Sequence, residues 1–222
     1  MKKLLLLLAL LATPLVMQVP PLEILKLKTF DYLVPEYAPS GNFVILDITE
    51  EEVRAEGGWP LPRQRLAEIH QEILQKGALG VGWVLSFVDK DRFGGDSEYI
   101  LAVSQSSSSI VATFSFDNQQ YPKPTGTVIL GPDVQGITLP GHLPNIEGIS
   151  DYVLEGVVSA PVDIDNLVRR LPLLYQMPDG WAPSFGTQVL KALTGSDTYV
   201  IRTNEYGIEE IRVKGIPAVP TD

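Results

Sequence analysis

Acidic side chains follow an apolar run in the first quarter of the chain. Residues 43–48 read Phe-Val-Ile-Leu-Asp-Ile, and Glu50, Glu51 and Glu52 come directly after Thr49. An acid at the end of a buried strand lies where open α/β sheets often bind ligands. Asp47 and Glu50 are therefore candidate ligands for a cation or a polar molecule. The alternative is structural: Asp47 accepts hydrogen bonds from the next loop, and the glutamates are solvated.

The loop after these acids combines an aromatic ring with a guanidinium group. Residues 57–63 read Gly-Gly-Trp-Pro-Leu-Pro-Arg. Trp59 can cover the edge of a sheet or the base of a helix, and Arg63 can form a bidentate pair with Asp47. An aromatic ring beside an arginine at a helix start can instead hold an anionic ligand. Both interpretations stay open, and a fold-holding role is the simpler one.

A third cluster lies far downstream. Asp163, Asp165 and Asn166 favour a turn, because Asp and Asn side chains hydrogen-bond their own backbone. Arg169 and Arg170 follow. In an extended strand these two side chains point to opposite faces, so one can pair with an acid such as Asp165 while the other faces solvent or a ligand. Asp165, Arg169 and Arg170 complete the candidate ligand-binding set, with the structural role again the simpler.

Metal binding and catalysis are not predicted. The stretch from Asp89 begins like a calcium loop, but Phe93 and Ile100 stand where later oxygen ligands are required. His70 and His142 are the only histidines, and a core-edge or surface role suits them better than catalysis. The sequence lacks a complete dinucleotide or phosphate loop and a nucleophile elbow. We therefore expect no metal, no cofactor and no catalytic residues.

The composition excludes further classes of protein. The 222 residues carry a net charge of -10 at pH 7, which argues against a nucleic-acid partner. The chain has no cysteine, so disulfides, thiolate metal sites and cysteine nucleophiles are excluded. A secreted or periplasmic hydrolase that uses acids such as Asp47 and Glu50 is the alternative enzyme class, and it has no recognisable base–nucleophile pair.

The elements that must position these residues form an α/β pattern. Residues 43–48 predict a buried strand, residues 62–75 an amphipathic helix, and the apolar run at 79–87 a second strand, which together make a βαβ unit. Further strands are expected at 110–116, 127–130, 157–160 and 167–175, helices at 96–104 and after Ser184, and a hairpin at 199–203 and 208–213. The predicted fold is a mixed, largely parallel sheet with a βαβ start and C-terminal hairpins, preceded by an N-terminal membrane helix.

The N-terminus differs from the rest of the chain. Lys2 and Lys3 precede an apolar run that continues with interruptions to Leu22. A cleaved signal peptide and an uncleaved anchor both have this pattern, and the anchor is preferred. We therefore divide the chain into a membrane anchor or signal segment at 1–22 and a domain at 23–222. Both alternatives put residues after about 25 outside the cytoplasm, because the basic end stays inside.

Several of these short motifs, taken together, resemble the CHASE2 domain, an extracytoplasmic sensor module of bacterial membrane-bound signalling proteins. The matching motifs are Phe30-Asp31, the Gly-x-Trp-Pro-x-Pro-Arg pattern at 57–63, the Lys-Gly-Ala at 76–78, the Asp-x-Asp turn at 163–165, and Arg169-Arg170 before Leu-Pro-Leu. The likeness runs from about residue 22 to 222. One departure is Val84, which replaces the acid of the family's Phe-Asp-x-x-Phe strand.

The resemblance implies a sensor rather than an enzyme. It predicts a periplasmic domain on the inner membrane, held by residues 4–22, which binds an unknown small signal or a partner. A second copy of the chain, as a homodimer, is the other candidate partner. Family members continue with further strands, membrane helices and an output domain such as a nucleotide cyclase, a histidine kinase or a serine/threonine kinase. This chain lacks those parts, so the domain is expected to be truncated at its C-terminal end.

Overall fold

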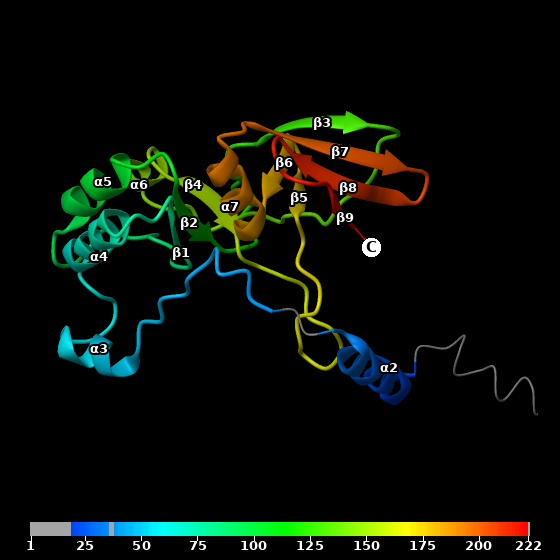
Figure 1. Cartoon of the computed structure of the whole chain (residues 1–222), viewed down its shortest axis with the longest axis horizontal. Coiled ribbons are helices and arrows are strands. Elements are labelled where there is room, and N and C mark those ends of the chain that lie inside the picture. The colour runs from blue at the N-terminus through cyan, green and yellow to red at the C-terminus, as the bar shows by residue number, and fades with distance from the viewer. Residues whose placement is uncertain (1–18, 36–37, 222) are drawn as a thin grey trace, which may run out of the picture. The chain divides into compact units, whose positions relative to one another are not determined.

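The computed structural model describes residues 19–35 and 38–221, and the chain divides into two units. The first unit contains Met1–Asp47 and Pro161–Arg170. The second contains Ile48–Ala160 and Leu171–Asp222. Figure 1 shows the helices and strands of both units along the chain.

The first unit has one described helix, α2 (Pro20–Leu33). The prolines at its first positions suit a helix start, because their missing N–H groups have no partner there in any case. None of its side chains is buried. No helix within residues 19–35 and 38–221 combines the length and the apolar character that a membrane crossing requires. Most of the predicted anchor at 4–22 lies outside the described residues.

A three-stranded parallel sheet forms one half of the second unit. Its order is β1 (Val81–Trp83), β2 (Ser109–Thr113), β4 (Leu154–Val157). Helix α5 (Asp96–Ser104) connects β1 to β2, and helix α6 (Glu147–Ser150) precedes β4. The βαβ arrangement is therefore present, but it begins at β1, the second strand of the predicted unit, and not at residues 43–48.

Helices cover both faces of this sheet. On one face, α4 (Arg63–Gln75) packs beside α5 (Figure 1), over a core that contains Trp83 and Tyr99. On the other face lies α7 (Phe185–Thr194). The close approach of α7 to β4 requires a glycine at position 156, because a Cβ atom on Gly156 would lie 2.5 Å from the Cα of Phe185. The contact fixes α7 against β4, the outer strand of the sheet.

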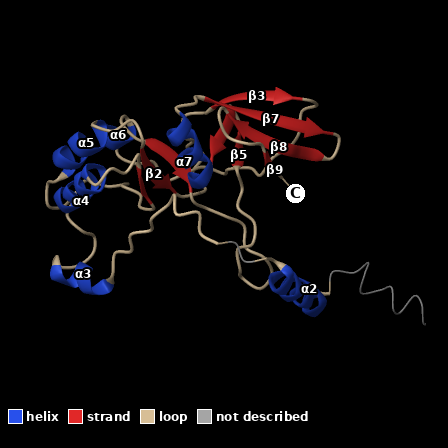
Figure 2. Cartoon of the chain, viewed as in Figure 1, coloured by secondary structure: helices blue, strands red, loops and turns tan. Residues whose placement is uncertain are grey.

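The other half of the second unit contains two more sheets, whose strands are drawn in Figure 2. A hairpin pairs β5 with β6, and a four-stranded sheet has the order β3-β7-β8-β9. Only β3 and β7 are parallel in the latter. The strands are β3 (Gly126–Leu130), β5 (Leu174–Met177), β6 (Gly180–Pro183), β7 (Thr198–Asn204), β8 (Gly207–Val213) and β9 (Val219–Pro220). The mixed α/β class and the C-terminal hairpin are confirmed, whereas the single sheet divides into three.

Two predicted strands are wrong. Residues 43–48 form no strand, and the side chains from Phe43 to Leu46 are between 61% and 93% exposed. Residues 167–173 are also irregular, and the strand in that region begins only at Leu174. An apolar, β-branched composition shows that a segment can fit into a sheet, but a strand forms only where another strand is available to pair with it.

Candidate functional site

Among the seven predicted ligand-binding residues, the structure pairs only Asp165 with Arg169. Asp47 is exposed, and Glu50 lies on α3 (Glu50–Ala55), where it pairs with Arg54 at 3.1 Å. Glu52 and Thr49 cap the start of α3. The side-chain oxygen of each residue accepts a hydrogen bond from the backbone N–H of the other, which is a capping box. The hydrogen bond from the Thr49 backbone lowers the pKa of Glu52. The acids after residue 47 therefore have local structural explanations.

Arg63 is buried at the start of α4 and joins it to the loop before α5. Its guanidinium donates to the carboxylate of Asp96 and to the carbonyl of Asp89, and it lies 5.0 Å from the ring centroid of Phe87. Its backbone N–H donates to Asp91 at 3.0 Å. The anticipated pairing of Arg63 with Asp47 is wrong, because its carboxylate partner is Asp96.

Trp59 differs from Arg63 in its surroundings. Its side chain is 56% exposed, so the ring does not fill a core position. An exposed indole contributes little to packing, and its N–H needs no protein partner. The aromatic residue and the arginine of the same motif are thus separated into a surface side chain and a buried ion pair.

Arg169 forms the densest ion-pair cluster in the described residues, and we call it the Arg169 clamp. Its Nε and Nη2 donate to Asp31 at 2.7 and 2.8 Å. Its Nη1 and Nη2 donate to Asp165 at 2.8 and 2.7 Å, and Nη1 also donates to Asp163 at 3.0 Å. Hydrogen bonding to Arg169 lowers the pKa of Asp165 to about 2. Arg170 is largely exposed and makes only a 3.6 Å contact with Asp163.

The clamp uses every donor that an arginine has. A guanidinium carries five N–H groups, and the five bonds above employ all of them. No donor remains for a ligand. The contacts instead tie the loop at 161–170 to Asp31 on α2, which is a structural task. This arrangement explains why Phe30-Asp31, the Asp-x-Asp turn and Arg169 occur in one sequence.

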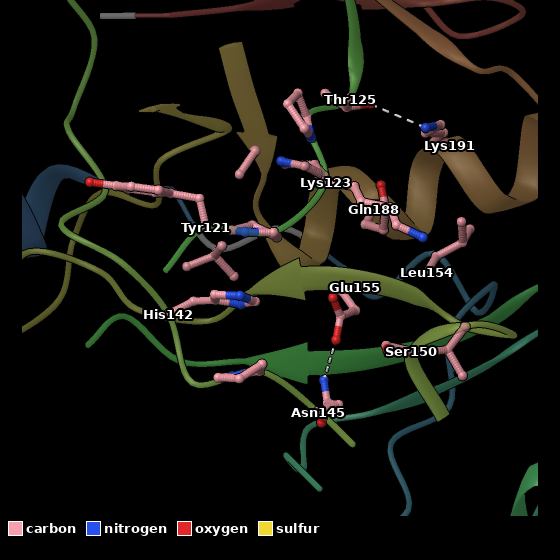
Figure 3. A pocket seen from close by; sticks show the side chains of 17 residues that line it. Tyr121, Lys123, Thr125, His142, Asn145, Ser150, Leu154, Glu155, Gln188 and Lys191 are labelled. Atoms are coloured by element: carbon pink, nitrogen blue, oxygen red, sulfur yellow. Dashed lines mark hydrogen bonds between the residues drawn. The ribbon is translucent and has the colours of Figure 1, made fainter. Parts of the chain in front are cut away.

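A cavity of about 360 Å³ lies along the outer strand β4 in the second unit (Figure 3). Residues of the 121–125 segment, β4, β6 and α7 line it, with Asn145 and His142 from the connection before α6. Its size is within the range of small-molecule sites. The cavity contains three buried polar side chains, His142, Asn145 and Gln188. This is the site that best suits a ligand.

The hydrogen bonds around His142 define its tautomer. The Thr113 hydroxyl donates to the carbonyl of Leu143 at 2.8 Å, so its one proton is committed. Thr113 Oγ1 lies 3.0 Å from His142 Nδ1 and must accept from it. The other ring nitrogen, Nε2, therefore carries a free lone pair. Burial lowers the pKa of His142, opposed in part by Glu155, and this keeps the ring neutral at pH 7.

Glu155 and Asn145 form a connected pair beside this histidine. Asn145 Nδ2 donates to Glu155 Oε1 at 2.7 Å and to the carbonyl of Ala112 at 3.3 Å, while its Oδ1 accepts from the Phe87 backbone at 2.6 Å. Figure 3 shows the Glu155 carboxylate directed at Asn145. Because the partner is a neutral amide, Glu155 keeps its negative charge uncompensated there.

Gln188 and Lys191 lie one turn apart on α7 and provide donors. Gln188 Oε1 accepts from the Tyr199 hydroxyl at 3.2 Å, which orients the amide and leaves its N–H groups free of any hydrogen bond to a described residue. Lys191 Nζ donates to Thr125 at 3.1 Å and lies 5.8 Å from the ring centroid of Tyr199. Burial lowers the pKa of Lys191, and Asp197 opposes that shift.

The second histidine is structural. Trp83 Nε1 donates to His70 Nδ1 at 3.1 Å, so the proton of the neutral ring is on Nε2, which faces Ser109 at 3.2 Å. A general base for Ser109 would need the opposite tautomer, with a free lone pair on Nε2. Ser109 and His70 are also buried. The pair thus offers no support for the hydrolase alternative.

The cavity is not predictable from the sequence alone. Its walls come from segments far apart in the chain, and the sequence predicts no helix or strand between residues 117 and 126, part of which lines the cavity. Two signals were present: Glu155 interrupts an otherwise uncharged strand, and Lys191 lies on a helix with a strong apolar face. Either position is unremarkable by itself, and only their meeting in one cavity suggests a site.

Comparison with known proteins gives a family match. The model of the CHASE2 domain matches residues 4–220, nearly the whole chain. No curated protein sequence and no solved structure matches this chain.

Proposed function

Because the chain belongs to the CHASE2 family of sensor domains, we propose that it is the extracytoplasmic sensor of a bacterial membrane-bound signalling protein. In this proposal the cavity beside β4 binds a small polar molecule. The output, a nucleotide cyclase or a kinase, belongs to a cytoplasmic domain outside this chain. Binding shifts the population between two conformations that the output distinguishes.

The observation that carries the proposal is the unused hydrogen-bonding capacity in the cavity. The side chains of His142 and Gln188 are mostly buried, but their Nε2 atoms remain accessible from the cavity and bond to no other described residue. A polar ligand that enters the cavity can bond to both atoms, while the opposite ends of the two side chains stay held by Thr113 and Tyr199.

The Arg169 clamp supports a route for the signal along the chain. The loop at 161–170 continues from β4, which ends at Val157, and leads into β5, which begins at Leu174. The clamp ties this loop to α2, and α2 follows the predicted membrane segment. A change in β4 on ligand binding therefore has a short covalent path to a helix beside the membrane.

A thermal-shift screen of small polar metabolites tests the function. A ligand at 100 times its dissociation constant adds about 2.7 kcal/mol to the free energy of unfolding, which raises Tm by about 5–10 °C at this chain length. Ser150→Trp places a bulky ring in the cavity wall and should abolish the shift. Ser104→Trp, at an exposed position on α5, should leave it intact.

Two results would overturn the cavity as the sensing site. One is a screen in which no compound raises Tm. The other is a shift that Ser150→Trp leaves unchanged, which would place the ligand elsewhere on the domain.

The membrane placement is tested separately by N-terminal sequencing of protein from the membrane fraction. A retained anchor gives a sequence that begins at or near Met1. A mature start near residue 20 would instead indicate a signal peptide, and a secreted binding protein would become the better description.

A further inference from the structure

The cavity beside β4 contains charges of both signs that do not neutralise each other. Lys123 and Lys191 line it, and within the described part of the chain neither lysine has a carboxylate within ion-pair distance. Glu155 lines the same cavity and has no cationic partner among the ion pairs of those residues. Lys191 and Glu155 are partly buried and Lys123 is exposed. A partly buried charge is costly unless a partner compensates it.

The donors gather on one wall. In Figure 3, Lys191 and Gln188 extend from α7, and Lys123 and Thr125 belong to the segment that precedes β3. Lys191 has three N–H groups, of which Thr125 accepts one. The free amide N–H groups of Gln188 add neutral donors beside it. Two ammonium groups and an amide suit a carboxylate.

The acceptors belong to β4 and to the connection before α6. Glu155 provides carboxylate oxygens, held in place by Asn145, and His142 provides the lone pair of Nε2. Asn145 acts as a positioning residue, because both of its donors and its acceptor are used inside the protein. An anionic oxygen and a neutral imidazole nitrogen suit an ammonium group.

We propose that the ligand of this cavity is a zwitterion with a carboxylate and an ammonium group, namely a free α-amino acid. This inference rests on the proposed sensor function and names the ligand class of its site. The carboxylate pairs with Lys191 and Lys123, and the ammonium group with Glu155 and His142. Val153, Leu154 and Val157 also line the cavity and provide apolar surface for the amino-acid side chain.

The test uses the full-length protein and isothermal titration calorimetry with the twenty common amino acids. For each amino acid that binds, two analogues are titrated: the amine that lacks the carboxylate and the acid that lacks the ammonium group. The zwitterion should bind at least about tenfold more tightly than either analogue, because each loses a charge-assisted hydrogen bond.

Two isosteric variants locate the charges. Glu155→Gln keeps the bond to Asn145 and should weaken amino-acid binding at least about tenfold, while binding of the acid analogue stays unchanged. Lys191→Met should weaken the amino acid to a similar extent and leave the amine analogue unchanged. Glu51→Gln and Lys214→Met make the same chemical changes at exposed positions and serve as matched controls.

The outcomes separate this inference from the sensor function. If an acid or an amine analogue binds as tightly as its amino acid, the cavity senses small molecules but the zwitterion assignment fails. If amino acids bind and both variants retain full affinity, the proposed contacts are wrong. If none of the twenty amino acids binds, the inference is overturned, and the wider screen then decides the sensor function.

Discussion

The buried His70 should make the stability of this domain depend on pH. The ring is inaccessible to solvent and accepts a hydrogen bond from Trp83 on Nδ1, a nitrogen that must be protonated in the charged form. Burial lowers the pKa of His70 from 6.5 to about 4. In the unfolded chain the ring protonates at its usual pKa, so between these two values the unfolded state binds more protons. The free energy of unfolding therefore falls as pH drops through this window, and His70 contributes no further change above pH 6.5.

The pKa difference sets the size of the effect. The full shift corresponds to about 3 kcal/mol. At pH 5, where most carboxylates are still ionised, the linkage relation gives a loss of about 2 kcal/mol relative to pH 8. Urea denaturation at a series of pH values, with unfolding followed by tryptophan fluorescence and by circular dichroism, measures this loss directly.

The matched variant is His70→Gln. A glutamine can accept from Trp83 through its oxygen and donate to Ser109 through its nitrogen, and it does not titrate. His142 titrates in both proteins, so the difference between their pH profiles isolates His70. We expect the wild type to lose about 2 kcal/mol more than the variant between pH 8 and pH 5. Equal losses in the two proteins would refute the assignment of a neutral, buried His70.

Three further experiments test the roles that the structure assigns outside the cavity. Arg169→Gln should speed hydrogen exchange of the backbone amides of α2, because it removes the bonds to Asp31. Arg170→Gln loses only one 3.6 Å contact and should not change that exchange. Equal amide protection of α2 in the two variants would exclude the clamp. Ile45→Asp should change the free energy of unfolding by less than about 0.5 kcal/mol in urea melts, because the side chain is exposed, and a loss of several kcal/mol would mean that residues 43–48 are a buried strand after all. Arg63→Met should lower the free energy of unfolding by about 3 kcal/mol in the same assay, because it leaves the partly buried carboxylate of Asp96 unpaired. Trp59→Ala should lower it by less than about 1 kcal/mol, because that side chain is exposed. A larger loss for Trp59→Ala than for Arg63→Met would contradict the burial of these two residues.

Local patterns predicted the elements that carry their own signals. The apolar face of the helix at 62–75 and the turn residues of the hairpin at 199–213 both correspond to observed elements, α4 and the β7–β8 pair. Ser184 caps α7, and Gly195 ends it in the left-handed conformation. In each case the information lies within a few residues of the element.

Pairing between distant segments was not predictable in this way. Residues 43–48 have the composition of a strand, but a strand needs a second strand to pair with. Composition does not identify that second strand. The partner of Arg63 shows the same limit. Asp47 and Asp96 are both acids at plausible positions, and only the packing of α4 beside α5 selects Asp96. Composition thus identified the arginine as important and misidentified what it binds.

The two arginine motifs and the cavity show how structure and sensing can be separated in one domain. Arg169 has the charge that a ligand site needs, but three aspartates already use its five donors. Lys191 lies in no family motif recognised from the sequence, yet it has N–H groups to spare and faces a cavity with an uncompensated glutamate. The buried arginines that hold this fold have their partners within the chain. A ligand can bind only where the chain leaves charge and hydrogen-bonding capacity unused, and in the described residues that condition is met beside β4.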